Sequence, residues 1–295
     1  MSDMRDKLKH YMDTLGDNNH FNGTVLIGYQ DRILFKGGYG SSSFQYAIPN
    51  TPETIFRVGS ITKAFTAMAI LLLHEQGSLN IEDTVSVFLP DFPNGDRITI
   101  HQLMTHTSGV KNFTANSDYW STRMRLPFTL EETIDSFKEP PLGFNPGTKM
   151  DYSNSGYILL TAIIEKAAQM PYADFLKKWI FIKLGLANTG VDNGRTIIKG
   201  LATGHTVWED VIHTSFIDMT FPLGAYGIYS CVEDLFKWSR ALVKYQLLPK
   251  ELQDRMFCGF EKGYGYGWAI EEGSGKVVPG ILAILMASLT ILTCI

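Results

Sequence analysis

Hydrophobic and polar positions follow two periods along this chain, and the change of period separates strand-like ends from a helical middle. The expected elements of the first part are a short amphipathic helix over residues 3–15, a hairpin of strands 23–29 and 32–38, a loop over 41–54 and a buried helix over 64–73. Gly77 follows the last apolar turn, and it is the predicted stop of this helix.

After Gly77, short helices alternate with polar loops rich in proline and glycine. The expected helices are residues 98–104, 129–137, 157–169, 172–182 and 233–247. Thr99 and Thr129 are predicted caps, the latter because two glutamates follow it. Residues 185–222 carry no clear period, and we expect them to be irregular.

The C-terminal part returns to strand-like sequence. Residues 264–271 predict a strand and residues 272–275 its turn. The run from Val277 to Ile295 carries no charge and has nearly the length of a membrane-spanning helix. The competing interpretation is two buried strands, 281–286 and 289–295, joined at Ala287 and Ser288; we favour it because a Pro-Gly pair at 279–280 argues against a simple helix.

This order of elements predicts an α+β fold. We expect one antiparallel sheet, built from the two ends of the chain and flanked by helices, with an all-α lobe inserted between them. The predicted sheet lobe comprises residues 1–79 and 223–295, and the predicted helical lobe comprises residues 80–222. A cleft between two such lobes is the natural place for a ligand.

Composition narrows the possible functions. Hydrophobic residues make up 45% of the 295 residues and charged residues 19%, which is enough to form a core. The net charge of −4 offers no basic surface for nucleic acid. The three cysteines are widely spaced, so they indicate neither a disulfide framework nor a zinc site. We therefore expect no metal and no cofactor.

The first residues are polar and lack the apolar core of a signal peptide. This favours a cytoplasmic protein, or a periplasmic or extracellular one whose export signal has been removed. A membrane partner is not expected, and the sequence does not indicate the oligomeric state.

Ser60 and Lys63 lie three residues apart at the start of the apolar helix, where they share one face. The positive helix terminus and the apolar surroundings both disfavour a charged lysine. A neutral Lys63 could take the proton of Ser60 and make it a nucleophile. On this spacing alone, the alternative stays open that Ser60 caps the helix and Lys63 extends to water.

A second pair of polar residues follows a Pro-Gly loop. Tyr152 and Asn154 are two apart, so an extended backbone projects their side chains to the same side. A phenol and an amide together can transfer a proton and orient a carbonyl group. The alternative is that they serve as an aromatic anchor and a helix cap. His106, between two threonines, is interpreted as a structural loop histidine.

In this order and spacing, the motifs resemble those of the serine beta-lactamase and penicillin-binding-protein superfamily. The similarity is closest to the branch related to class C beta-lactamases, with its esterases, D-aminopeptidases and D-alanyl-D-alanine carboxypeptidases. The stretches that carry the resemblance are Phe56–Lys63, Asn145–Tyr157, Leu103–Gly109 and Gly227–Ser230 followed by Asp234 and Leu235. The resemblance runs from about Gly23 to Trp268, and it implies the beta-lactamase/transpeptidase-like fold.

The resemblance also implies a mechanism. Ser60 attacks an ester or amide carbonyl and forms an acyl-enzyme, with Lys63 as proton acceptor. Tyr152 passes the proton to the leaving group, and Asn154 orients the substrate and Lys63. The backbone N–H of Ser60 supplies half of an oxyanion hole, and an N–H on a late strand supplies the other half. The implied substrates are small esters or D-amino-acid peptides, with beta-lactams as a further candidate.

One motif of the family is missing. The late strand usually carries H-x-G or K-T-G before a Pro-Gly pair, whereas this chain reads G-K-V-V-P-G over 275–280 and has no histidine after His213. Lys276 is the candidate replacement for the cationic group, and Tyr119 and Tyr226 are candidates to line the cleft. The missing motif keeps a second interpretation open, namely a catalytically impaired, binding-only member of the family.

Overall fold

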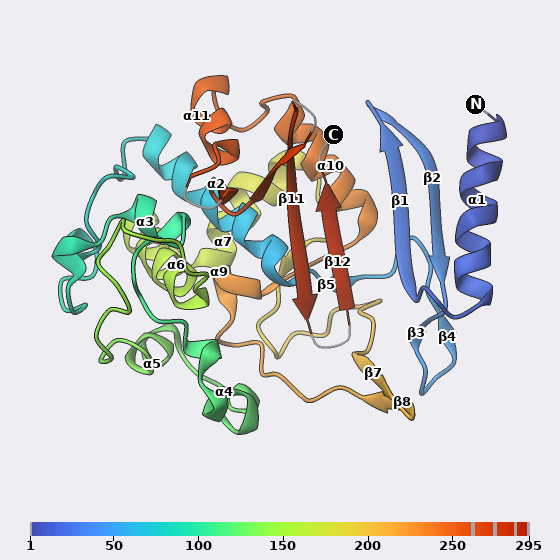
Figure 1. Ribbon diagram of the computed structural model, residues 1–295, viewed down its shortest axis with the longest axis horizontal. Coiled ribbons are helices and arrows are strands. Elements are labelled where there is room, and N and C mark those ends of the chain that lie inside the picture. The colour runs from blue at the N-terminus through green and yellow to red at the C-terminus, as the bar shows by residue number, and fades with distance from the viewer. Residues whose placement is uncertain (1, 261–262, 274–275, 286–287, 294–295) are drawn as a thin grey trace.

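The computed structural model describes residues 2–260, 263–273, 276–285 and 288–293, with side chains described over 4–207, 209–260 and 263–270. It is a mixed α+β structure, as predicted (Figure 1). Its α-helices are α1 (Ser2–Asp17), α2 (Thr62–Glu75), α3 (Ile100–Met104), α4 (Ser117–Ser121), α5 (Leu130–Asp135), α6 (Asn154–Ala168), α7 (Tyr172–Leu176), α8 (Ile182–Leu184), α9 (Leu223–Tyr226), α10 (Val232–Val243) and α11 (Lys250–Asp254).

The strands are short except at the two ends of the chain. They are β1 (Gly23–Tyr29), β2 (Arg32–Tyr39), β3 (Ser41–Ser43), β4 (Ile48–Pro49), β5 (Phe56–Arg57), β6 (Gly190–Val191), β7 (His205–Trp208), β8 (Asp210–His213), β9 (Ile228–Ser230), β10 (Ala269–Gly273), β11 (Lys276–Leu285) and β12 (Ser288–Thr293). In the view of Figure 1, β1, β2, β11 and β12 occupy one half of the molecule and α3 to α6 the other. The division into a sheet lobe and an inserted helical lobe stays a prediction.

The strands that were predicted to form a single sheet belong to two separate hydrogen-bonded groups. Among the described residues, β1 pairs with β2 in a two-stranded hairpin, while β10, β11 and β12 form a separate three-stranded antiparallel sheet. A register shift between Ile27 and Gly28 interrupts the hairpin. Helix α10 connects to this hairpin through an ion pair between Arg240 and Asp31, with Nε and Oδ1 3.1 Å apart.

Helix α2 forms the centre of the core. Every residue from Thr62 to Leu73 is buried, because this helix packs against α6, α7 and α9. Phe65 stacks on Trp238 of α10 with ring centroids 4.2 Å apart. The helix ends before Gly77, whose φ of +71° suits a residue without Cβ, so the predicted stop is confirmed.

Local capping chemistry explains where two of the short helices begin. The side chain of Thr99 accepts from the backbone N–H of Gln102 ahead of α3, and the Thr99 N–H donates in turn to the Gln102 side-chain oxygen. Thr129 and Glu132 form the same reciprocal arrangement at α5. Both predicted caps are therefore confirmed. The predicted helix over 172–182 is interrupted by a π-helical turn, η6 (Lys177–Phe181).

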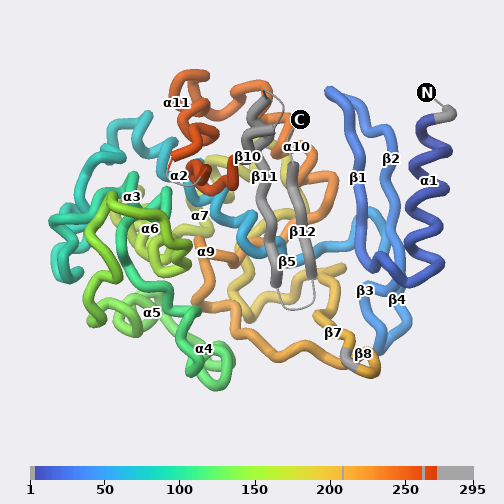
Figure 2. Tube along the Cα trace, viewed as in Figure 1, coloured from blue at the N-terminus to red at the C-terminus, as the bar shows by residue number. Residues whose placement is uncertain are grey.

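Two segments that were expected to be irregular contain short strand pairs. The expected loop over 41–54 contains the strand pair β3–β4, and the expected irregular region contains the hairpin β7–β8. Figure 2 shows the two pairs at the same corner of the trace, where the backbone N–H of Thr203 donates to the Ser42 carbonyl at 2.8 Å. Neither pair was predicted, because both are short: β3–β4 consists of serines and a two-residue strand, and β7–β8 is largely exposed, so neither shows an alternating apolar face.

The strand expected over 264–271 was placed too early. The ladder of β10 begins at Ala269, and Tyr264 makes only an isolated bridge to Ala269. The intervening segment turns, with Gly267 at a φ of +78°. Aromatic and glycine residues alternate there, which resembles a strand pattern although the backbone reverses.

The end of the chain forms strands, so the two-strand prediction is confirmed. Strand β11 pairs with β10 on one side, from Gly273↔Lys276 to Ala269↔Gly280, and with β12 on the other. The predicted junction residue Ala287 lies outside the described residues. Among the residues that the structure describes, no helix is both long and apolar enough to cross a membrane.

Candidate active site

Ser60 lies in a short 3₁₀ turn, η1 (Gly59–Ile61), that connects β5 to α2. Gly59 has a φ of +54°, so the chain reverses sharply just before Ser60. Ser60 remains partly exposed, whereas Ile61 and the residues after it are buried. The turn thus presents the Ser60 hydroxyl at a surface while its neighbours anchor it in the core.

Lys63 is completely buried one turn further along. Its Nζ donates to Asn154 Oδ1 at 2.8 Å and to the Ala225 carbonyl at 2.7 Å, and it lies 3.1 Å from Ser60 Oγ. Two carbonyl acceptors and one hydroxyl match a neutral amine, which has two N–H groups and one lone pair. Within the described residues, no carboxylate forms an ion pair with this lysine.

The pKa of Lys63 is lowered well below its usual value of 10.5 because burial removes the ammonium group from water. No surrounding negative charge compensates for this desolvation. The bonding pattern and the burial both favour the neutral amine, so the lone pair of Lys63 is available to the Ser60 hydroxyl.

Tyr152 lies on the other side of Ser60. Its phenolic oxygen is 2.6 Å from Ser60 Oγ, and the Lys63 Nζ lies 4.7 Å from the centre of its ring. Burial raises the pKa of Tyr152 far above 10, so the phenol keeps its proton. A protonated phenol can donate to Ser60 Oγ while the Ser60 hydroxyl donates to Lys63.

Asn154 opens helix α6 and connects the two halves of the site. Its Oδ1 accepts from Lys63, and its Nδ2 donates to Thr114 Oγ1 at 2.9 Å. The backbone N–H of Asn154 donates to Asn112 Oδ1 at 3.1 Å. These bonds fix the orientation of the Asn154 side-chain amide, so that its oxygen and not its nitrogen points at Lys63. Sequence reasoning missed Asn112 and Thr114, because neither belongs to a motif; each is recognisable only by its contact in space.

His106 packs behind Tyr152. The two ring centroids are 4.4 Å apart, and His106 Nδ1 accepts from the Ser153 backbone N–H at 3.1 Å. Burial holds the pKa of His106 well below 6.5, so the ring is neutral. Within the described residues, His106 contacts Tyr152 and the Ser153 backbone rather than Ser60, in keeping with its interpretation as a structural loop histidine.

A late strand does lie beside Ser60. Strand β11 packs against the turn that carries Ser60. Lys276 begins this strand, and its side chain lies outside the described residues. Pro279 within the strand has no N–H, so it cannot be the second oxyanion donor.

A cavity of ≈ 540 Å³ begins at Tyr152 and Asn112. We call it the Tyr152 cavity; its other walls include Lys111, Phe113, Tyr119, Arg123 and Asp151. Its size suits a small-molecule substrate. Arg123 was not predicted as a site residue, because the segment around it follows no recognisable motif.

Of the two tyrosines predicted to line the cleft, Tyr119 lines this cavity. Tyr226 lies behind Tyr119, and the phenolic oxygens of these two residues are 2.5 Å apart. Tyr226 is not among the residues described as walls of the cavity. Over the described residues, no group of three or more histidine, cysteine, aspartate or glutamate side chains is arranged to hold a metal ion.

The serine turn, the buried lysine and the tyrosine thus lie together on a mixed α+β scaffold. Comparison with protein families gives a match to the Beta-lactamase family over residues 4–284, so the chain belongs to that family.

Known proteins support the same assignment. The chain is 31% identical to penicillin-binding protein 4* of Bacillus subtilis over 92% of its length, and it spans 64% of that relative. A penicillin-binding protein of Bacillus halodurans has a similar structure, with a TM-score of 0.85 and 26% identity over 95% of this chain and 89% of that one. A D-stereospecific amidohydrolase from Streptomyces has a TM-score of 0.74 and 26% identity over 82% of this chain and 78% of that one.

Proposed function

We propose that the protein is a serine hydrolase that forms an acyl-enzyme on Ser60. The observation that carries this proposal is the bonding of Lys63, which is buried without a carboxylate partner and lies 3.1 Å from Ser60 Oγ. A neutral amine at this distance can accept the serine proton as the hydroxyl attacks a carbonyl carbon. Membership in the Beta-lactamase family supports the same chemistry.

Proton movement follows from the contacts around Ser60. Lys63 accepts the proton of Ser60 as the bond from Oγ to the carbonyl carbon forms. Tyr152, whose oxygen lies 2.6 Å from Ser60 Oγ, donates its proton to the leaving group and recovers one through Lys63. In the second half of the reaction, the same groups take a proton from a water molecule as its oxygen bonds to the acyl carbon. The bond from that carbon to Ser60 Oγ then breaks, the acid leaves, and the proton returns to Ser60 Oγ.

The proposed substrates are small esters or amides of D-amino acids and D-amino-acid peptides, with beta-lactams as weaker candidates. Similarity to a D-stereospecific amidohydrolase and to penicillin-binding proteins supports this class. No metal or cofactor takes part in the proposed steps. The rival is a binding-only protein, which the missing H-x-G or K-T-G motif makes plausible.

Labelling separates these two functions. The wild-type protein is incubated with a fluorophosphonate and with a fluorescent penicillin, and hydrolysis of nitrophenyl esters is followed in parallel. We expect covalent labelling and ester hydrolysis, both abolished in Ser60→Ala. Labelling that is absent from the wild type, or that persists unchanged in Ser60→Ala, would overturn the hydrolase proposal in favour of the rival.

A further inference from the structure

The Tyr152 cavity carries a distribution of charge that its proposed catalytic role does not require. Two cations, Lys111 and Arg123, lie in its walls together with one anion, Asp151. Asp151 directly precedes Tyr152 in the chain, and it is exposed. The net charge of the cavity wall is therefore positive, and Arg123 supplies one of its two cations.

Arg123 has no protein anion to neutralise it. Among the described residues, its guanidinium makes no hydrogen bond or ion pair, and its only described interaction is with the ring of Phe128, 6.0 Å from the ring centre. The neighbouring Arg125, in contrast, donates to the Ser121 carbonyl. A guanidinium left available in a cavity wall is suited to bind a planar anion through two parallel hydrogen bonds.

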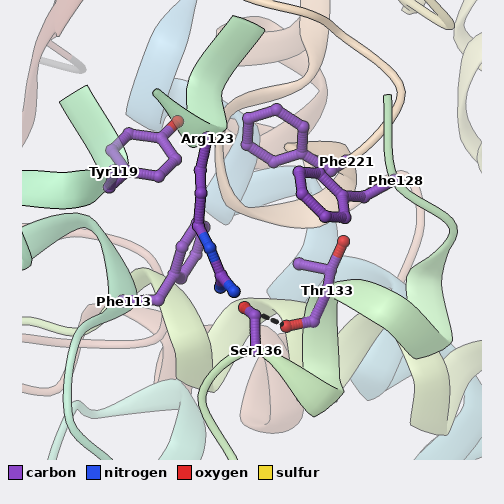
Figure 3. Close-up of a pocket in the computed structure, with 7 residues that line it drawn as sticks. All are labelled: Phe113, Tyr119, Arg123, Phe128, Thr133, Ser136 and Phe221. Carbon is purple, nitrogen blue, oxygen red and sulfur yellow. Dashed lines mark hydrogen bonds between the residues drawn. The ribbon is translucent and has the colours of Figure 1, made fainter. Parts of the chain in front are cut away.

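Aromatic and hydroxyl groups surround this guanidinium. Arg123 also lines a narrow pocket with Phe113, Tyr119, Phe221 and Ser136. Figure 3 shows its side chain running between the aromatic rings, with the guanidinium directed toward Ser136. Arg123 itself is exposed, so its guanidinium remains accessible to an anion that enters the cavity.

The segment that carries Arg123 is held in place by the core. Arg123 begins the 3₁₀ turn η5 (Arg123–Arg125), and the next residue, Met124, is 1% exposed. The Met124 carbonyl accepts from the Asp218 N–H at 2.8 Å, and the Phe128 N–H donates to Thr220 Oγ1 at 3.0 Å. The position of Arg123 relative to Tyr152 is thus fixed by anchored backbone on both sides.

We infer that the Tyr152 cavity receives the acyl part of the substrate, and that Arg123 binds a carboxylate or another anionic group on that part. This inference rests on the proposed function. The leaving group departs after acylation, whereas the acyl part stays on Ser60, so a walled cavity beside Tyr152 suits the part that stays. Arg123, a wall residue that lies apart in sequence from Tyr152, supplies the cation that attracts an anionic group on this part.

Paired esters test this inference. The substrates are the 4-nitrophenyl monoesters of adipic and suberic acids, each compared with the ester in which the free carboxylate is methylated. For each protein, the measured quantity is the ratio of kcat/KM for the acid to kcat/KM for its methyl ester. We expect a ratio of about ten or more in the wild type, a fall of about tenfold in Arg123→Gln, and partial retention in Arg123→Lys. Arg125→Gln, in the same turn, is the matched control and should keep the wild-type ratio.

Two further arms make each outcome decisive. A wild-type ratio near one, or an equal fall in Arg123→Gln and Arg125→Gln, would overturn the inference while hydrolysis of the methyl esters left the proposed function standing. A dependence on Arg123 seen only with 4-carboxyphenyl butyrate, whose anion is on the leaving group, would also overturn it. If no ester is hydrolysed, calorimetry with monomethyl adipate on Ser60→Ala decides: binding that weakens about tenfold when Arg123→Gln is added supports anion recognition, and unchanged or undetectable binding contradicts it.

Discussion

The ring of His106 packs against the ring of Tyr152 with centroids 4.4 Å apart, and the His106 Nδ1 accepts a hydrogen bond from the backbone N–H of Ser153. One residue thus fixes both the side chain and the following peptide of Tyr152. His106 itself has a φ of +59°, a conformation that few residues other than glycine and asparagine adopt readily. It is a positioning residue in the proposed mechanism, not a catalytic one.

Replacement of His106 should therefore lower turnover more than substrate binding. We expect His106→Ala to reduce kcat by about 10- to 100-fold with little change in KM, because a small displacement of Tyr152 disturbs proton transfer. His106→Asn tolerates the backbone conformation but lacks the ring, so it should lose kcat while retaining more stability. Steady-state kinetics with thermal unfolding distinguish the two effects, and a change confined to the melting temperature would contradict the positioning role.

The buried amine of Lys63 makes both activity and stability depend on pH. Its folded pKa is depressed, so activity should be present above that pKa and should fall as pH drops through it. Between the folded pKa and 10.5, the unfolded chain binds a proton that the folded chain does not, so stability rises with pH.

Comparison with Lys63→Met isolates this contribution. The difference in free energy of unfolding, wild type minus Lys63→Met, should rise with pH by at most about 1.4 kcal/mol per unit across that window. Urea unfolding at a series of pH values measures it. A difference that stays constant from acid to alkaline pH would mean that Lys63 is protonated in the folded protein.

Asn154→Asp should impair the base without removing the hydrogen bond. A carboxylate 2.8 Å from the Lys63 Nζ would favour the ammonium form and raise the pKa of that lysine. We expect activity at neutral pH to fall about 100-fold or more and to recover partly as pH rises. Asn154→Ala, which adds no charge, should lose activity without this alkaline recovery, as pH–rate profiles of kcat/KM would reveal.

Gly267 and Gly77 form a matched pair for stability. Both have positive φ, +78° and +71°, but an added Cβ at Gly267 would lie 2.7 Å from the backbone at Lys63 and Ala64, whereas at Gly77 no atom lies within 4 Å. Gly77→Ala should therefore cost about 1 kcal/mol from the backbone conformation alone. Gly267→Ala should cost clearly more, and it should also lower activity by displacing Lys63. Equal melting temperatures for the two variants would contradict this steric account.

Local signals explain what could be predicted from the sequence. Thr99 and Thr129 mark helix starts because a cap and its partner lie three residues apart, and the stop at Gly77 is equally local. The two strands at the end of the chain were predicted from two apolar runs joined at Ala287 and Ser288, with a Pro-Gly pair near the start that argued against a helix. Ser60, Lys63, Tyr152 and Asn154 could be predicted to lie together because their motifs are short and ordered along the chain.

What could not be predicted depends on contacts between distant segments. The Ala225 carbonyl that binds Lys63 is a backbone atom, so no residue type indicates it. Arg123 faces the cavity because the backbone around it is anchored far along the chain, by Asp218 at Met124 and by Thr220 at Phe128. The short hairpin β7–β8 has largely exposed faces, so its sequence lacks the alternation that would indicate strands.

The burial of helix α2 on all sides has a consequence for how the protein loses its function. The amide groups of a helix enclosed by the core exchange with solvent only when the whole fold opens. Ser60 and Lys63 are attached to the slowest-exchanging part of the molecule, so local fraying at the surface cannot separate them. Heating should therefore abolish covalent labelling of Ser60 in the same cooperative step that exposes the core tryptophan Trp238.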